Sequence, residues 1–109
     1  INGTCFTEII DMFLRDEDTN AIVMIGEIGG TAEIEAADFI KNHKIKKPTI
    51  GFVAGSSAPK GKRMGHAGAI ISEGPETADA KIKILKECGV SVAKTVSEIG
   101  ETMLKLIEE

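Results

Sequence analysis

Two short apolar segments on either side of a helical pattern constrain the fold of this 109-residue chain more than any other feature. Residues 21–26 (AIVMIG) and 48–55 (PTIGFVAG) each end in glycine, which is typical of strands buried on both faces of a parallel sheet. Between them, residues 31–44 begin with Thr31 as a cap and have acidic side chains first and basic ones last, the charge order of an α-helix. The sequence therefore predicts a strand–helix–strand unit.

Helical patterns flank this unit on both sides. Apolar side chains spaced as on one helix face predict a helix over residues 6–13, with Thr4 as its cap. The same spacing predicts a helix over residues 76–88 that ends at Gly89. Residues 67–71 (AGAII), which precede this second helix, are expected to form a short strand or a turn.

The C-terminal residues continue the alternation of strands and helices. Residues 90–93 (VSVA) predict a third strand, and Thr95 with Glu98 three positions later predicts a capping box. The last helix is expected to bury a stripe of apolar residues: Ile99, Met103, Leu106 and Ile107.

This alternation predicts an α/β fold, an open parallel sheet with helices on both faces, of the flavodoxin-like or Rossmann-like type. Such a domain usually has five or more strands, and the pattern here predicts three. We therefore expect residues 1–109 to form one partial domain, with N-terminal strands of the fold missing from this chain.

Composition excludes several classes of function. A net charge of −4 gives no general attraction to nucleic acid or to an anionic membrane, and without Trp or Tyr the chain lacks the stacking platforms of single-strand binders. Its apolar runs are far shorter than the roughly 20 residues needed to span a bilayer. Cys5 and Cys88 are far apart and lack metal-site spacing, so we expect two small core residues and no metal bound by this chain.

Two loops are expected at one edge of the sheet, because parallel strands all end at the same edge and ligands gather there. Residues 26–30 (GEIGG) lead into the N-terminus of a helix, where exposed N–H groups favour an anion. Residues 55–68 follow the next strand and contain His66. Glu27 and His66 are therefore predicted to lie close together.

The pair is suited to phosphoryl transfer. A neutral imidazole is a good nucleophile toward phosphorus, and a carboxylate that accepts its other N–H fixes the tautomer and raises its basicity. The residues expected to bind the phosphate are Gly29, Gly30, Lys60, Lys62, Arg63 and Gly65.

The alternatives are that His66 is a loop or packing residue and that Glu27 only caps a helix. The loop is not a P-loop, because its glycine spacing is one residue too long and Arg63 stands in place of Ser or Thr.

These motifs resemble those of a known family. APKGKRMGHAGAIIS at 58–72, AIVMIGEIGGTAE at 21–33 and PTIGFVAG at 48–55 are similar to the α subunit of succinyl-CoA synthetase, also called succinate–CoA ligase. The resemblance extends from NGTCFTEIIDMF near the start to EIGETMLKLIEE at the end. ATP-citrate lyase also carries GHAGA but differs before it, and ADP-forming acyl-CoA synthetases tend to have threonine in place of Ala67. The residues here favour the succinate enzyme.

The resemblance implies an activity and its partners. Succinyl-CoA and phosphate would give CoA and enzyme-bound succinyl phosphate, and His66 would take the phosphoryl group and pass it to ADP or GDP. The nucleotide and Mg²⁺ would bind in a β subunit, and CoA mainly outside this chain. By its position in GEIGG, Glu27 would correspond to the glutamate that hydrogen-bonds the histidine.

The resemblance also implies what this chain lacks. The family's α subunit begins with a CoA-binding domain, and its ligase domain begins with further strands and a phosphate loop, so the chain is expected to be a partial ligase domain. We expect it to be inactive without those parts and the β subunit. The expected compartment is a mitochondrial or related organelle matrix in a eukaryote and the cytoplasm in a bacterium. The alternative is a non-catalytic flavodoxin-like fragment that serves anion binding or subunit assembly.

Overall fold

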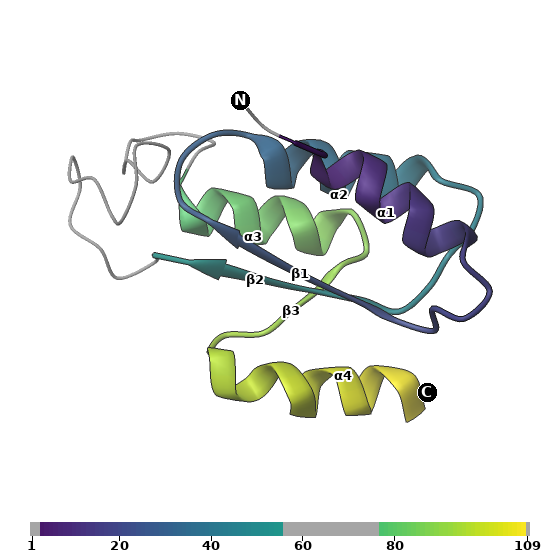
Figure 1. Ribbon diagram of the computed structural model, residues 1–109. Helices are drawn as coiled ribbons and strands as arrows, with labels where there is room; N and C mark the ends of the chain where they lie inside the picture. The colour runs from purple at the N-terminus through teal and green to yellow at the C-terminus, as the bar shows by residue number, and fades with distance from the viewer. Residues whose placement is uncertain (1–2, 56–76, 109) are drawn as a thin grey trace.

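The computed structural model describes residues 3–55 and 77–108 of the chain. Helices and strands alternate along it, as the sequence predicts (Figure 1). In chain order they are α1 (Phe6–Arg15), β1 (Ile22–Glu27), α2 (Ala32–Asn42), β2 (Thr49–Ala54), α3 (Ala78–Glu87), β3 (Ser91–Val92), the 3₁₀ turn η2 (Val96–Glu98) and α4 (Ile99–Glu108). The short strand or turn expected at residues 67–71 lies outside the described residues.

The strands form one parallel sheet in the order β1–β2–β3. β1 and β2 pair over their full length, from Ile22 opposite Thr49 to Glu27 opposite Ala54, whereas β3 adds two residue pairs to the other side of β2. Helices α1, α2 and α3 lie on one side of the sheet and α4 alone on the other (Figure 1). The predicted α/β class, with helices on both faces, is confirmed.

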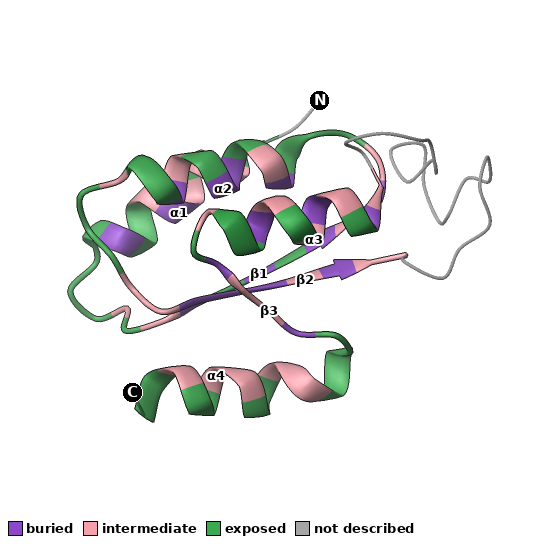
Figure 2. Cartoon of the chain, turned by 180° about the vertical axis from the view of Figure 1, so that it is seen from behind, coloured by how far each residue is buried: buried purple, intermediate pink, exposed green. Residues whose placement is uncertain are grey.

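The core lies between the sheet and the three helices on its first face. The side chains of β1 and β2 that point to this face meet the inward stripes of the helices, which appear as the buried patches in Figure 2. The buried apolar residues of this core are Ile10, Leu14, Ile22, Met24, Ile28, Ala36, Ala37, Ile40, Val53, Ala78, Leu85 and Val90. The stripes predicted from spacing in α2 and α3 thus face the sheet, whereas in α1 Ile10 and Leu14 are buried and Phe13, which the spacing placed on the stripe, is 44% exposed.

The second face of the sheet is incompletely covered, and here the sequence prediction is wrong. Val23 and Ile25 of β1 are 45% and 60% exposed, although the apolar run predicted a strand buried on both faces. The reason is the position of α4, which packs against β2 and leaves the outer strand uncovered. The apolar stripe expected in α4 is accordingly not fully buried, since Ile99, Met103 and Leu106 are only partly buried and Ile107 is 54% exposed.

Helix capping follows the predictions only in part. Cys5, not Thr4, is the cap residue of α1, and its side chain is exposed rather than in the core. Thr31 precedes α2 as predicted, but its side chain makes no capping bond. The Thr95–Glu98 capping box does not form, because the chain enters α4 through the 3₁₀ turn η2, in which the Glu98 N–H donates to the Thr95 carbonyl.

The end of α3 at Gly89 agrees with the sequence prediction, and its cap residue Thr77 was not predicted. The Thr77 hydroxyl accepts a hydrogen bond from the Ala80 N–H at 3.2 Å, which satisfies one of the free donors of the first turn. At the other end Gly89 has a φ of 90°, a left-handed conformation that favours glycine. The Val90 N–H then bonds back to the Leu85 carbonyl at 2.9 Å, so the helix ends where β3 must begin.

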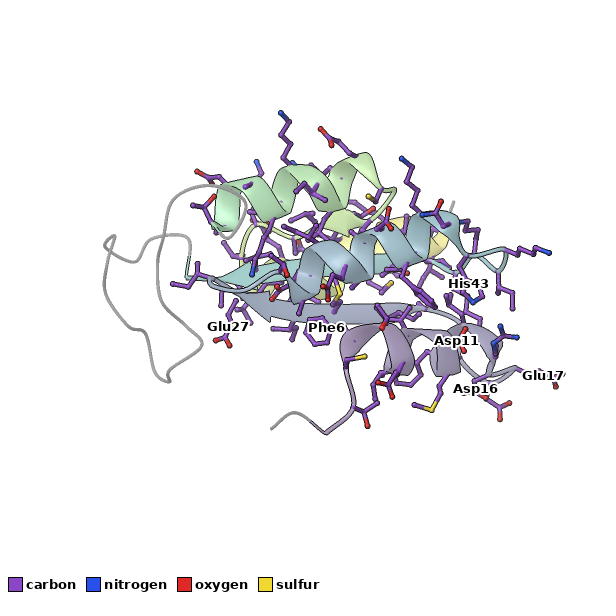
Figure 3. All side chains as sticks on the ribbon, turned by 90° about the horizontal axis from the view of Figure 1, so that it is seen from above. Phe6, Asp11, Asp16, Glu17, Glu27 and His43 are labelled. Carbon is purple, nitrogen blue, oxygen red and sulfur yellow. The ribbon has the colours of Figure 1, made fainter. Side chains whose placement is uncertain are left out.

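His43 joins two helices at the opposite end of the sheet from the carboxyl ends of the strands (Figure 3). It is the C-terminal cap residue of α2, as its position in the sequence indicates. Its Nδ1 accepts the Ile45 N–H, so Nε2 carries the proton and donates to the Asp11 carboxylate of α1 at 2.9 Å. Asp11 also receives a bond from Arg15 at 3.0 Å. The His43–Asp11 bond thus joins α1 to α2, and Arg15 binds the same carboxylate from within α1.

The His43 bond, followed by Arg15, lowers the pKa of Asp11 below its ordinary value of 3.8. Because the pKa is lower in the folded state, ionised Asp11 stabilises the fold above pH 3.8, and this contribution is lost as pH falls through the folded pKa. We expect Asp11→Asn to lower the urea midpoint at pH 6 and the difference to shrink below pH 3.8. Glu17→Gln, at an exposed site on the same side, is the control; equal midpoints for Asp11→Asn and wild type at pH 6 would contradict this role.

Candidate functional site

A cavity of about 470 Å³ opens at the carboxyl end of β1, where the strand gives way to α2. Glu27 lies at its rim, and the ring of Phe6 lies beside Glu27 in Figure 3. The cavity is lined by Phe6, Ile25, Gly26, Glu27, Gly29, Gly30, Ala32, Glu33 and Ala54. This is the sheet edge at which the sequence predicts a site, and three of the predicted site residues, Glu27, Gly29 and Gly30, line it together.

Glu27 is the last residue of β1 and is partly buried. Strand side chains alternate between faces, so Glu27 lies on the same face as Val23 and Ile25, away from α2 and α3. The next residue, Ile28, is buried and its N–H donates to the Ala54 carbonyl of β2 at 3.1 Å. Strand β1 thus ends with the carboxylate of Glu27, and the buried side chain of Ile28 follows directly.

Gly29 and Gly30 turn the chain from β1 into α2. Their φ values are 88° and 67°, two consecutive left-handed residues that side chains other than hydrogen would strain. The turn points the start of α2 at the cavity, and the first N–H groups of a helix lack partners within it. The predicted anion-binding role of these glycines is compatible with this geometry.

A buried ion pair that was not predicted from the sequence supports this turn. The Lys81 side chain of α3 is 0% exposed, and its Nζ lies 2.7 Å from Glu33 Oε1 of α2. Nζ also donates to the carbonyl oxygens of Glu27 at 2.7 Å and Gly29 at 2.6 Å. The other carboxylate oxygen, Glu33 Oε2, accepts the Glu27 N–H at 2.9 Å. The expected role of Glu33, a favourable charge at a helix N-terminus, is therefore only part of what it does.

A signal for this pair was present in the sequence. Lys81 falls three positions after Ala78 and four before Leu85, so it lies on the stripe that those two buried residues mark. A lysine on a buried stripe needs a partner of opposite charge, since an isolated ammonium group in the core is strongly unfavourable. Periodicity identifies such a lysine but not its partner, because Glu33 is 48 positions away.

The other predicted site residues lie outside the described ranges. These are the proposed nucleophile His66 and the proposed phosphate-binding residues Lys60, Lys62, Arg63 and Gly65. The segment that carries them leaves the described structure at Gly55, which approaches Ile28, and re-enters it at Thr77, one turn before Lys81. Both ends of the segment therefore lie at the same sheet edge as Glu27. The pairing of Glu27 with His66 stays a prediction.

The described residues contain further cavities but no candidate metal centre. One of them, of about 490 Å³, lies around Arg15, Phe39 and His43, at the opposite end of the sheet from Glu27. Within residues 3–55 and 77–108, no group of three or more His, Cys, Asp or Glu side chains is placed to hold a metal ion. None of the helices in these ranges is long and apolar enough to cross a membrane.

Comparison with protein families gives one match that decides the assignment. The CoA-ligase family model matches residues 1–97, which is most of the chain. The chain belongs to the CoA-ligase family. The resemblance found in the motifs is confirmed by relatives described as the α subunit of ADP-forming succinate–CoA ligase. The protein from Staphylococcus aureus is 56% identical over all 109 residues, and that from Staphylococcus epidermidis is 59% identical over 104 residues.

The match covers only part of each relative. This CoA-ligase chain spans 36% of the Staphylococcus aureus protein and 34% of the Staphylococcus epidermidis protein. Among solved structures, ATP citrate lyase from Methanothrix soehngenii, in complex with citrate and coenzyme A, superimposes with a TM-score of 0.81 at 29% identity. That superposition covers 92% of this chain and 17% of the lyase. The prediction of a partial α/β domain is thus confirmed.

Gly26 makes room for the buried ion pair, and this gives a test of it. A methyl group on Gly26 would overlap the Glu33 side chain, which would have to move away from Lys81 and the Glu27 N–H. We expect Gly26→Ala to lower the free energy of unfolding by about 1–3 kcal/mol, as measured by urea denaturation. Gly100→Ala is the matched control, because Gly100 of α4 faces open space and the change should stabilise the helix by about 0.5–1 kcal/mol. Unchanged stability of Gly26→Ala would mean that the pair does not depend on this glycine.

Proposed function

We propose that this chain is the part of a succinate–CoA ligase α subunit that carries a phosphohistidine at His66. In the first step, phosphate attacks the thioester carbonyl of succinyl-CoA, and CoA leaves as succinyl phosphate forms. His66 then attacks the phosphorus of succinyl phosphate, and succinate leaves. Finally the phosphoryl group passes from His66 to a nucleoside diphosphate, which regenerates the free imidazole. Each step is reversible.

The arrangement at the sheet edge carries this proposal. The segment with the KGKRMGHAGA motif starts after Gly55 and ends at Thr77, and both residues lie at the edge where Glu27 lines a 470 Å³ cavity. Parallel α/β sheets bind ligands at this edge. The identity to succinate–CoA ligase α subunits over the whole chain supports the same substrate class.

In the proposed mechanism Glu27 orients His66. Its carboxylate accepts the N–H of the imidazole nitrogen that does not attack, which fixes the tautomer and makes the attacking nitrogen more basic. As the phosphoryl group transfers, positive charge develops on the ring and the carboxylate stabilises it. Because Glu27 ends a sheet strand, its backbone is held more firmly than a loop residue would be.

The remaining site residues bind the phosphate in this proposal. The side chains of Lys60, Lys62 and Arg63 provide charge-assisted hydrogen bonds, and the backbone at Gly29, Gly30 and Gly65 allows close approach of N–H groups. A β subunit holds the nucleotide with Mg²⁺, and CoA binds mainly outside this chain. Because the chain spans 36% of the Staphylococcus aureus relative, turnover is proposed only for the complete subunit in complex with its partner.

Phosphorylation of His66 can be tested directly. In the complete α subunit assembled with a β subunit, labelled nucleoside triphosphate and Mg²⁺ should give an acid-labile, base-stable label on the α subunit. His66→Asn should abolish the label, because asparagine has no nitrogen nucleophile. His43→Gln is the matched control, since His43 is the other histidine and lies at the opposite end of the sheet. Equal labelling of His66→Asn and wild type would refute the phosphohistidine.

The role of Glu27 can be tested by removing its charge. Glu27→Gln keeps the shape of the side chain but removes the charge that steadies the imidazolium. We expect the rate of phosphorylation to fall by roughly 10- to 1000-fold in rapid-quench measurements, the scale on which positioned acid–base partners contribute. Glu35→Gln makes the same change at an exposed site in the first turn of α2 and should leave the rate unchanged. If Glu27→Gln also leaves it unchanged, Glu27 only ends the strand.

A role in assembly is a second candidate function, which accompanies catalysis. The observation in its favour is the exposure of large apolar side chains on two elements, Val23 and Ile25 of β1 and Leu104 and Ile107 of α4. Exposed apolar side chains that form a patch mark macromolecular contacts. His66→Asn should therefore copurify with the β subunit in wild-type amounts, which separates loss of chemistry from loss of assembly.

A further inference from the structure

Lys81 and Glu33 hold three main-chain groups of the turn after β1 at once. Lys81 Nζ binds the carbonyls of Glu27 and Gly29, and Glu33 Oε2 binds the Glu27 N–H. Both main-chain polar groups of Glu27 are therefore bound by this one ion pair. A residue whose N–H and C=O are both fixed has a fixed Cα position, and the direction in which its side chain leaves the backbone is fixed as well.

The two side chains of the ion pair are almost fully buried. The side chains of Lys81 and Glu33 are 0% and 5% exposed, and no buried side-chain nitrogen or oxygen of the described residues is without a partner. Hydrogen bonds between charged groups strengthen in such surroundings. The backbone of Glu27 is thus held by two short bonds, of 2.7 Å at its carbonyl and 2.9 Å at its N–H, to charged side chains that are themselves buried.

The ion pair also connects Glu27 to the segment that carries His66. That segment ends at Thr77, the cap residue of α3, and Lys81 lies one helical turn later on the same helix. The Thr77 hydroxyl fixes this first turn through the Ala80 N–H. The helix that bounds the His66 segment is therefore the helix that holds Glu27.

We propose that Glu33 and Lys81 are positioning residues for phosphoryl transfer, which act through the backbone of Glu27. Neither side chain touches the substrates in this proposal, which rests on the proposed function of Glu27 and His66. Their task is to hold the Glu27 carboxylate where it meets the imidazole. A displacement of about 1 Å in a reacting group can reduce a rate by on the order of 100-fold, so loss of the pair should be visible in the chemistry itself.

The test is a double-mutant cycle in the complete α subunit assembled with its β subunit. Lys81→Met removes the ammonium group while keeping an unbranched apolar chain, and Lys83→Met makes the same change at an exposed position of α3. The rate of phosphorylation by labelled nucleoside triphosphate is measured for Lys81→Met, for Glu27→Gln and for the double variant. Circular dichroism and copurification with the β subunit report on folding and assembly.

A positioning role predicts non-additive losses, because Lys81 can act on the chemistry only while Glu27 has its carboxylate. Lys81→Met should lower the rate by roughly 10- to 100-fold in the wild-type background and by less than about 3-fold in the Glu27→Gln background. Lys83→Met should match wild type. A purely structural role for Lys81 would lower the rate by the same factor in both backgrounds.

Each other result identifies which proposal is wrong. If Glu27→Gln lowers the rate of phosphorylation but Lys81→Met leaves it at the wild-type value, only the positioning role is wrong. The same holds if Lys81→Met lowers the rate by the same factor in the wild-type and Glu27→Gln backgrounds. If Glu27→Gln has the wild-type rate, the proposed role of Glu27 is wrong and the positioning role with it.

Glu33→Gln keeps the proposal testable if Lys81→Met fails to fold. The amide oxygen still accepts from Lys81, but its NH₂ group faces the Glu27 N–H in place of the acceptor Oε2. We expect the same non-additive pattern with Glu27→Gln. Glu35→Gln, an exposed glutamate on the same turn of α2, is its control, and a wild-type rate for Glu33→Gln would overturn the proposal.

Discussion

The buried ammonium group of Lys81 joins the end of β1, the first turn of α2 and the first turn of α3. It has three acceptors within 2.7 Å, one charged and two on the main chain. Moving a charge from water into the protein interior costs free energy unless the charge meets its partners there. Breaking such a buried pair commonly destabilises a protein by about 3–5 kcal/mol. The three elements must therefore form together, and the shape of the candidate site depends on their doing so.

The same ion pair explains residue choices in the turn that otherwise look like separate features. Gly26 lacks the side chain that would displace Glu33, and Gly29 presents its carbonyl to Lys81 from a left-handed conformation. Glu27 contributes its backbone to the pair and leaves its side chain on the other face of the sheet. The conformation of the GEIGG segment thus depends on its bonds to Glu33 and Lys81 as well as on any ligand that it binds.

The elements of the fold were largely predictable, because periodicity reports which side of an element is buried. The parallel strand–helix order and the inward stripes of α2 and α3 follow from it. The failures share a cause. The exposed faces of β1 and α4 carry apolar residues as core elements do, and a sequence pattern does not distinguish a surface buried within the chain from one left open. Capping was mispredicted at Thr4 and Thr95, and Thr31 holds the predicted cap position without a side-chain capping bond, because residue type alone does not fix the geometry of a helix end.

By itself the sequence determined the class of fold, the family motifs and the presence of Glu27 and the two glycines at a strand end, because these depend on local spacing and on residue identity. Only the tertiary structure decided that Glu33 and Lys81 form one buried pair under that strand end, and that one face of β1 is open. Both facts depend on contacts between residues far apart in the chain, such as Lys81 and Glu27, 54 positions apart. No local pattern specifies such contacts, since they are set by how the helices pack on the sheet.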